Sequence, residues 1–95
     1  MTEKFTRFDA AEYLKTPEDM AAYLDACFDD EGGGVLIRAA LNDIARAQGM
    51  TQVARDAGLG RESLYKALSS TGNPEFATIM KVMKALGLRL HAVAV

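Results

Sequence analysis

The chain has 95 residues, of which 49% are hydrophobic and 25% are charged, and its net charge is −2. This length allows one domain with a modest core and leaves no room for a separate catalytic domain. The sequence has neither a run of 18 apolar residues nor an apolar signal segment, so we expect no membrane insertion and no secretion. Its single cysteine, Cys27, cannot form an internal disulfide, which favours a cytoplasmic location.

The charges are divided unevenly along the chain. Residues 1–34 hold nine acidic and three basic side chains, whereas residues 35–95 hold eight basic and four acidic ones. The second part is therefore suited to phosphate groups and the first part to a basic partner. An acidic surface that simply faces solvent is an equally good interpretation.

The first 48 residues predict an N-terminal arm (1–15) followed by two helices (16–48), the first acidic and the second mixed in charge. Thr16 suits the N-cap position of the first helix, with Pro17 at the first helical position and Asp19 three residues after the cap. Five apolar residues then recur at helical spacing, namely Met20, Tyr23, Leu24, Cys27 and Phe28. A flexible joint at glycines 32–34 separates this helix from the second, whose inward residues are Leu36, Ala40, Leu41, Ile44 and Ala45.

Residues 51–68, TQVARDAGLGRESLYKAL, predict two short helices joined by a glycine turn. Ala54 is small enough for the helices to cross closely, and Gly58 can adopt the positive φ that such a turn demands. The apolar residues expected to face inward are Val53, Ala57, Leu59 and Leu64. This pattern is typical of a helix-turn-helix whose second helix enters the major groove of DNA. An ordinary helix pair in a bundle is the alternative interpretation.

The last part of the chain predicts a fifth helix over 73–87 and a short β-strand over 88–95. Asn73 is the expected cap and Pro74 the first helical residue, and Gly87 is the expected left-handed end. The expected buried stripe is Phe76, Ile79, Met80, Met83 and Leu86. A lone strand exposes unpaired backbone groups. It must therefore pair with a weaker candidate at Phe5–Phe8, with a second copy, or with another protein. Pairing with a second copy would build the homodimer that a palindromic operator requires.

The motifs GM-T-x-VA, LYKALS, GNP and T-x-x-K-V-x-K-ALGL lie within a run that resembles the HigA-like addiction-module antidote (antitoxin) family. The resemblance covers about Phe8 to Leu90. The predicted elements form an all-α, five-helix domain with a short C-terminal strand, and the resemblance implies that its helix-turn-helix is of the Cro/repressor type. The resemblance also implies a bacterial protein of the cytoplasm that binds a cognate basic toxin, typically a RelE/ParE-like ribonuclease, and represses its own operon. A stand-alone Cro/repressor-type regulator without a toxin partner is the alternative.

The candidate DNA contacts lie on the two motif helices: Thr51, Gln52, Arg55, Arg61, Glu62, Ser63, Tyr65 and Lys66. Arg61 can pair with guanine or phosphate, and Lys66 with a base or phosphate. Glu62 either accepts from cytosine or balances Lys66 four residues later. Arg55 either contacts phosphate or faces solvent. Tyr65 contacts phosphate, contacts a thymine methyl, or packs at the edge of the core.

The candidate toxin contacts are the acidic residues at the end of the first helix: Asp25, Asp29, Asp30 and Glu31. Carboxylates at a helix C-terminus oppose the helix dipole, which is consistent with a functional role. The sequence lacks a Ser-His-Asp set, a carboxylate pair at catalytic spacing and a metal-binding cluster, so we expect neither an enzyme nor a cofactor. The single histidine, His91, is expected to be structural.

Overall fold

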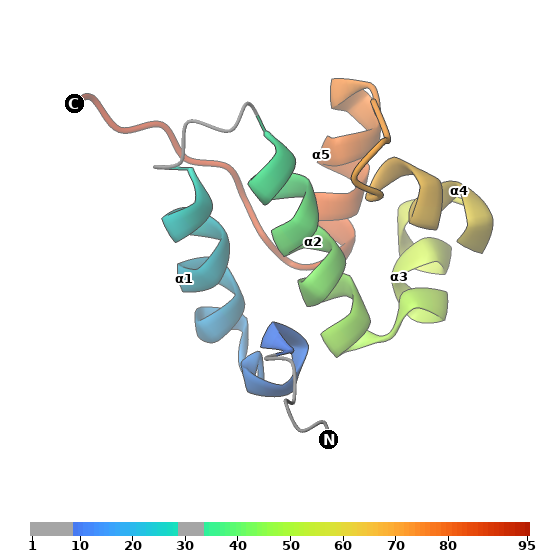
Figure 1. Ribbon diagram of the computed structural model, residues 1–95, viewed down its shortest axis with the longest axis horizontal. Coiled ribbons are helices and arrows are strands. Elements are labelled where there is room, and N and C mark those ends of the chain that lie inside the picture. Colours follow the sequence, from blue (N-terminus) through green and yellow to red (C-terminus); the bar gives the residue numbers. More distant parts are fainter. Residues whose placement is uncertain (1–8, 29–33) are drawn as a thin grey trace, which may run out of the picture.

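The computed structural model describes residues 9–28 and 34–95, which form five α-helices and one short 3₁₀ helix (Figure 1). The elements are η1 (Ala10–Tyr13), α1 (Pro17–Cys27), α2 (Val35–Gln48), α3 (Met50–Ala57), α4 (Arg61–Ala67) and α5 (Phe76–Ala85). Helices α1 and α2 lie side by side, and α3 packs against α2, α4 and α5. The expected all-α class is confirmed for the described residues.

The start of α1 is the capping box that its sequence predicts. The amide of Asp19 donates to Thr16 Oγ1 at 3.0 Å, and the Asp19 carboxylate accepts from the Thr16 amide at 3.2 Å. Pro17 occupies the first helical position, where a missing N–H costs no hydrogen bond. The expected helix start is therefore confirmed. Spacing alone predicts it because every contact that defines it lies within four residues.

The start of α5 is later than its sequence predicts. Glu75, with φ −68° and ψ 152°, is the N-cap, and Phe76 is the first helical residue. The amides of Thr78 and Ile79 donate to the Glu75 carbonyl at 3.0 and 3.2 Å. Asn73 is therefore not the cap. An N-cap residue has extended backbone and is followed directly by helical residues, and this change falls between Glu75 and Phe76, two residues later than predicted.

The end of α5 is a Schellman motif, as the glycine there predicts. Gly87 has φ +77°, its amide donates to the Lys84 carbonyl at 3.0 Å, and the Leu88 amide donates to the Met83 carbonyl at 2.9 Å. This turn sends the chain away from α5 and back toward α1 (Figure 1).

The core lies between α2 and the other helices. Its largest fully buried side chains are Leu41, Ile44, Val53, Leu64 and Val82. Burial of each such side chain stabilises the fold by about 1.5–3 kcal/mol relative to exposure.

Three residues expected to face inward are exposed instead, namely Leu36, Phe76 and Met80, and Phe28 of the apolar run in the first helix is exposed as well. Phe28, Leu36 and Phe76 lie at helix ends beyond the core, and Phe76 is 69% exposed. Met80 lies one turn after Phe76 on the same outward face. Val82, which was not in the expected stripe of α5, is fully buried.

Residues 88–95 do not form the expected strand. Within the described part of the chain they are an extended tail, and the only backbone hydrogen bond recorded from it is that of the Leu88 amide. Leu88 and Leu90 are partly buried and pack against the core. A strand is defined by its ladder partner, and none of the described residues forms a strand beside the tail. The candidate partner Phe5–Phe8 lies outside the described residues.

Candidate functional site

Helices α3 and α4 are joined by a three-residue turn that begins with a left-handed glycine. Gly58 has φ +72°, its amide donates to the Arg55 carbonyl at 3.1 Å, and the Leu59 amide donates to the Ala54 carbonyl at 2.9 Å. Gly60 then precedes α4 in extended backbone. The predicted role of Gly58 is confirmed. The turn sets α4 across α3 (Figure 1).

The inner surface of this helix pair is apolar and buried. Leu64 is 0% exposed, and the small Ala54 is also buried, as the sequence predicts. Leu59 is only half-buried at the edge of the core. Because α4 is anchored by Leu64 and by Leu68, which follows the helix, its other side faces solvent.

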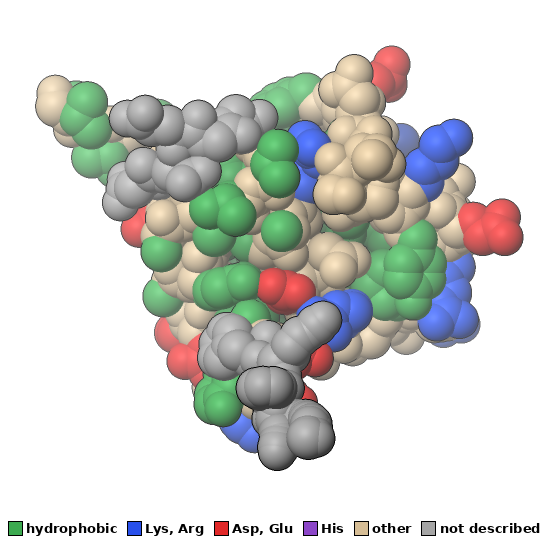
Figure 2. Space-filling model, viewed as in Figure 1, with side chains coloured by type: hydrophobic (Ala, Val, Ile, Leu, Met, Phe, Trp, Pro, Cys, Tyr) green, Lys and Arg blue, Asp and Glu red, His purple; other side chains and the backbone are tan. Residues whose placement is uncertain are grey.

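All the candidate DNA contacts are exposed. This holds for Thr51, Gln52 and Arg55 on α3 and for Arg61, Glu62, Ser63, Tyr65 and Lys66 on α4. In Figure 2, Lys and Arg side chains gather on the side of the molecule where α3 and α4 lie, with acidic side chains among them. The structure therefore brings these residues together on one accessible surface, which we call the α3–α4 surface.

Side chains on the α3–α4 surface contact one another. The Arg61 guanidinium donates to the Tyr65 hydroxyl at 3.2 Å and lies 5.4 Å from the centre of its ring. The Gln52 amide donates to the Asp56 carboxylate at 2.8 Å. Such exposed pairs stabilise the folded state by at most about 1 kcal/mol. The side chains can therefore break these contacts and bind a ligand at a low cost in free energy. Among the described residues, Glu62 forms no ion pair with Lys66.

The end of α4 is held by a residue that the sequence analysis did not single out. Arg38 on α2 donates to the carbonyl oxygens of Ser69 and Ser70 at 3.4 and 3.3 Å. Gly72 packs so closely beneath α4 that a Cβ there would lie 2.4 Å from the Lys66 carbonyl oxygen. These contacts position α4 relative to α2. No sequence signal pointed to Arg38, because its partners lie 31 and 32 residues away.

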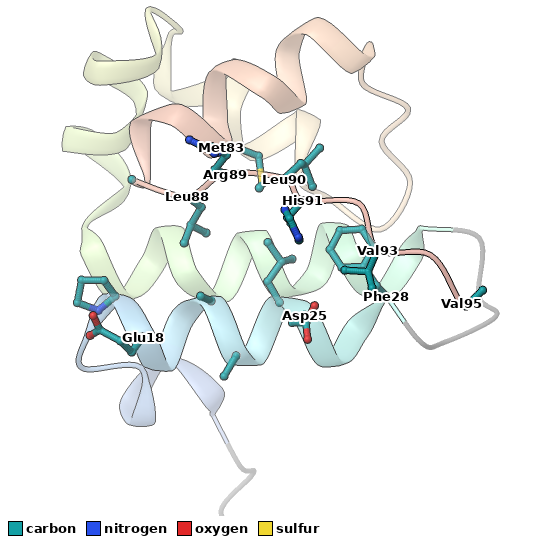
Figure 3. Close-up of a pocket in the computed structure, with 15 residues that line it drawn as sticks. Glu18, Asp25, Phe28, Met83, Leu88, Arg89, Leu90, His91, Val93 and Val95 are labelled. Carbon is teal, nitrogen blue, oxygen red and sulfur yellow. The ribbon is translucent and has the colours of Figure 1, made fainter.

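A second feature is a groove of about 840 Å³ between α1 and the tail (Figure 3). Asp25, a candidate toxin contact, is exposed on α1 and lines this groove together with Glu18. The exposed apolar side chains of Phe28 and Val93 also line it. The other candidate toxin contacts, Asp29, Asp30 and Glu31, lie outside the described residues.

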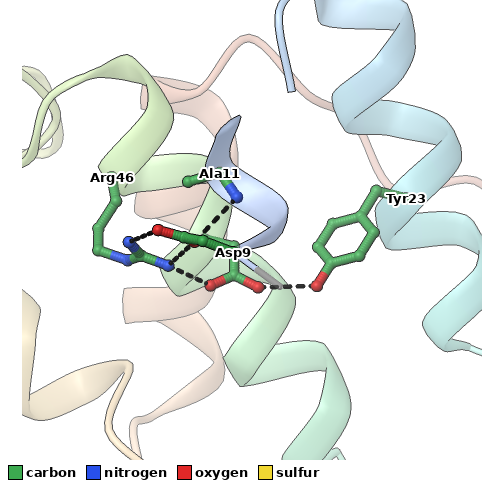
Figure 4. A network of polar contacts seen from close by, with 5 residues as sticks. Asp9, Ala11, Tyr23 and Arg46 are labelled. Atoms are coloured by element: carbon green, nitrogen blue, oxygen red, sulfur yellow. Dashed lines mark hydrogen bonds and ion pairs between the residues drawn. The ribbon is translucent and has the colours of Figure 1, made fainter. Parts of the chain in front are cut away.

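A polar network ties the N-terminal arm to α1 and α2 (Figure 4). The Arg46 guanidinium binds both oxygens of Asp9, at 2.9 and 3.2 Å, and the Asp43 carboxylate at 2.7 Å. Tyr23 donates to Asp43 at 2.7 Å. The hydrogen bond from Arg46 lowers the pKa of Asp9, and burial together with the Asp43 contact raises the pKa of Tyr23 to about 12. The network therefore joins Asp9 and α1 to the second half of α2.

Within residues 9–28 and 34–95, no group of three or more His, Cys, Asp or Glu side chains is arranged to hold a metal ion. No helix in these ranges combines the length and the apolar character needed to cross a membrane.

The fold and the α3–α4 surface are those of a small helical protein that presents an exposed helix pair. The chain belongs to a family described as probable addiction module antidote proteins, whose model matches residues 4–94. It is 56% identical over 91 residues to an uncharacterised protein of Haemophilus influenzae, covering 96% of this chain and 93% of that protein. No solved structure matches the chain. Membership of an antidote family implies a toxin partner.

Proposed function

We propose that the protein is a HigA-like antitoxin of a type II toxin–antitoxin module. In this proposal it neutralises a RelE/ParE-like toxin and represses its own operon by sequence-specific DNA binding. Helices α3 and α4 act as a Cro/repressor-type helix-turn-helix. The main support for this proposal is that α4 has two different sides. Leu64 is fully buried, whereas Arg61, Tyr65 and Lys66 face solvent. This division leaves the polar side free to lie in a major groove.

The proposed DNA contacts follow from the chemistry of each side chain. Arg61, in the first turn of α4, binds guanine O6 and N7 through its fork of donors. Lys66 binds a second base or a phosphate. Thr51 and Gln52, in the first turn of α3, bind phosphate with short polar groups and backbone amides.

The proposal includes a homodimer and a cytoplasmic location. A palindromic operator presents two half-sites about 34–36 Å apart, and a two-fold dimer matches them. The protein acts on DNA, so it works in the compartment that holds the operon. Its role is binding rather than catalysis.

Neutralisation of a basic toxin is supported by charge. Helix α1 carries Glu18, Asp19 and Asp25 and no basic residue. Acidic side chains of this kind steer a basic partner and oppose wrong ones. The stand-alone regulator remains the second candidate, and it differs only in having no toxin partner.

The DNA half of the proposal is tested by titrating the purified protein with DNA from upstream of its own gene. We expect the Arg61→Ala and Lys66→Ala variants each to bind this DNA about tenfold or more weakly, because each contact is worth roughly 1–3 kcal/mol. The matched control is Lys15→Ala, which removes an exposed cation that precedes α1. Unchanged binding by both α4 variants would overturn α4 as the recognition helix.

A further inference from the structure

The groove between α1 and the tail has apolar side chains that are open to solvent. Phe28, at the end of α1, is 47% exposed, and Val93 in the tail is 72% exposed. Both line the groove, and Figure 3 draws them near each other at the same end of it. Exposed apolar side chains within one concave surface are typical of an interaction site.

The tail offers backbone as well as side chains. From residue 89 onward it is extended, and no backbone hydrogen bond joins it to another described residue. Backbone that has no hydrogen-bonding strand beside it among the described residues is a template for a further strand from a partner. The apolar residues Leu88 and Leu90 hold the start of the tail against the core. The template is therefore anchored at one end.

The charged residues that line the groove indicate the charge of its partner. Glu18 and Asp25 line it from α1, and neither carboxylate has an ion-pair partner within the described ranges. The tail contributes His91, which points toward α1, and Arg89, which points to the other side of the tail (Figure 3). The α1 wall is therefore acidic, and an occupant with a lysine or arginine beside its apolar residues complements it.

The groove lies away from the α3–α4 surface. The tail and α4 lie toward opposite ends of the molecule, whose longest extent is 42 Å (Figure 1). The charge of the groove favours a different protein over a second copy as its occupant. The α1 wall is acidic, and a second copy, with its net charge of −2, does not complement it.

We propose that this groove is where the toxin binds, through an extended apolar segment of the toxin that pairs with the tail. A basic side chain of that segment faces Glu18 and Asp25. The inference rests on the proposed antitoxin function and specifies the surface that carries it. Because the groove and α4 are far apart, one molecule can hold toxin and operator at the same time.

The test measures binding of the purified small basic protein encoded beside this gene, by calorimetry, to the wild type and to three groove variants. These are Phe28→Asp, Val93→Asp and Asp25→Lys. We expect each to weaken binding at least tenfold and to leave operator affinity within twofold of the wild type. We also expect hydrogen exchange of the amides at 89–95 to slow when the toxin binds. Val93 lies in an exposed tail, so its substitution leaves the fold intact.

Two matched controls change the same residue types outside the groove. Phe76→Asp replaces another exposed phenylalanine, and Glu75→Lys reverses another exposed carboxylate. Both are expected to bind the toxin as the wild type does.

If the wild type binds the toxin and the groove variants bind equally well, the groove assignment is wrong and the antitoxin function stands. If the wild type does not bind it, the proposed function itself fails. If the groove variants instead change only the oligomeric state in sedimentation, the occupant is a second copy and the inference is overturned.

Discussion

The guanidinium of Arg61 lies against the phenol of Tyr65, one turn further along α4, with 3.2 Å between donor nitrogen and hydroxyl oxygen. Tyr65 thereby holds Arg61 on the exposed side of the helix. The ring contact, at 5.4 Å from the ring centre, adds a cation–π attraction of about 0.5–1 kcal/mol for an exposed pair. The pair orients the side chain that our proposal assigns to base recognition.

Arg61→Lys is expected to reduce sequence discrimination more than overall affinity. Lysine keeps the positive charge but lacks the planar fork that pairs with guanine O6 and N7. The affinity ratio between the operator and an operator with a substituted guanine should fall roughly tenfold or more. Lys15→Ala, which removes an exposed cation outside the α3–α4 surface, is the control and should change the ratio little. An unchanged ratio for Arg61→Lys would show that Arg61 reads no base.

The salt dependence of operator binding distinguishes the two interpretations of Arg55. A dimer that neutralises about six phosphates should lose roughly a thousandfold in affinity between 50 and 200 mM salt. If Arg55 contacts phosphate, as we expect, Arg55→Ala should reduce the slope of log K against log salt by about 1 per contact. Titrations at four or more salt concentrations measure this slope. A slope equal to that of the wild type would assign Arg55 to a solvent-facing role.

Gly72→Ala is expected to destabilise the protein by about 1–3 kcal/mol. An added Cβ would lie 2.4 Å from the Lys66 carbonyl oxygen and 3.0 Å from that of Ala67, so the backbone must shift. Urea unfolding followed by circular dichroism measures the change. Gly60→Ala is the matched control, because its Cβ would meet nothing closer than 3.9 Å and its φ is −70°. Equal losses for the two variants would contradict the close approach at Gly72.

The phenol of Tyr23 is expected to ionise late in an alkaline titration. Burial and the hydrogen bond to Asp43 raise its pKa to about 12, above the ordinary value of about 10. A raised pKa in the folded state contributes stability that is complete below the unfolded pKa. This contribution is lost as the pH rises from about 10 toward 12. Ultraviolet titration of the wild type and of Tyr23→Phe isolates this phenol by difference. The prediction is wrong if the component that disappears in Tyr23→Phe ionises near the ordinary pKa of about 10.

Local features of the sequence determined where several helices begin and end and which side of the motif faces out. The capping box at Thr16 and the left-handed ends at Gly58 and Gly87 depend on hydrogen bonds within a few residues, so spacing alone predicts them. The candidate DNA contacts on α4 are exposed because the helical period separates them from Leu64, and those on α3 because it separates them from Val53 and Ala54.

Tertiary contacts decided the rest. The exposure of Phe76, the hold of Arg38 on Ser69 and the path of the tail over α1 depend on how distant segments pack. The strand expected at 88–95 shows the same limit: its branched residues favour extended backbone, but only a neighbouring segment supplies a ladder, and no described segment does. Periodicity and capping are local properties, whereas partners more than 30 residues apart are brought together only when the core closes.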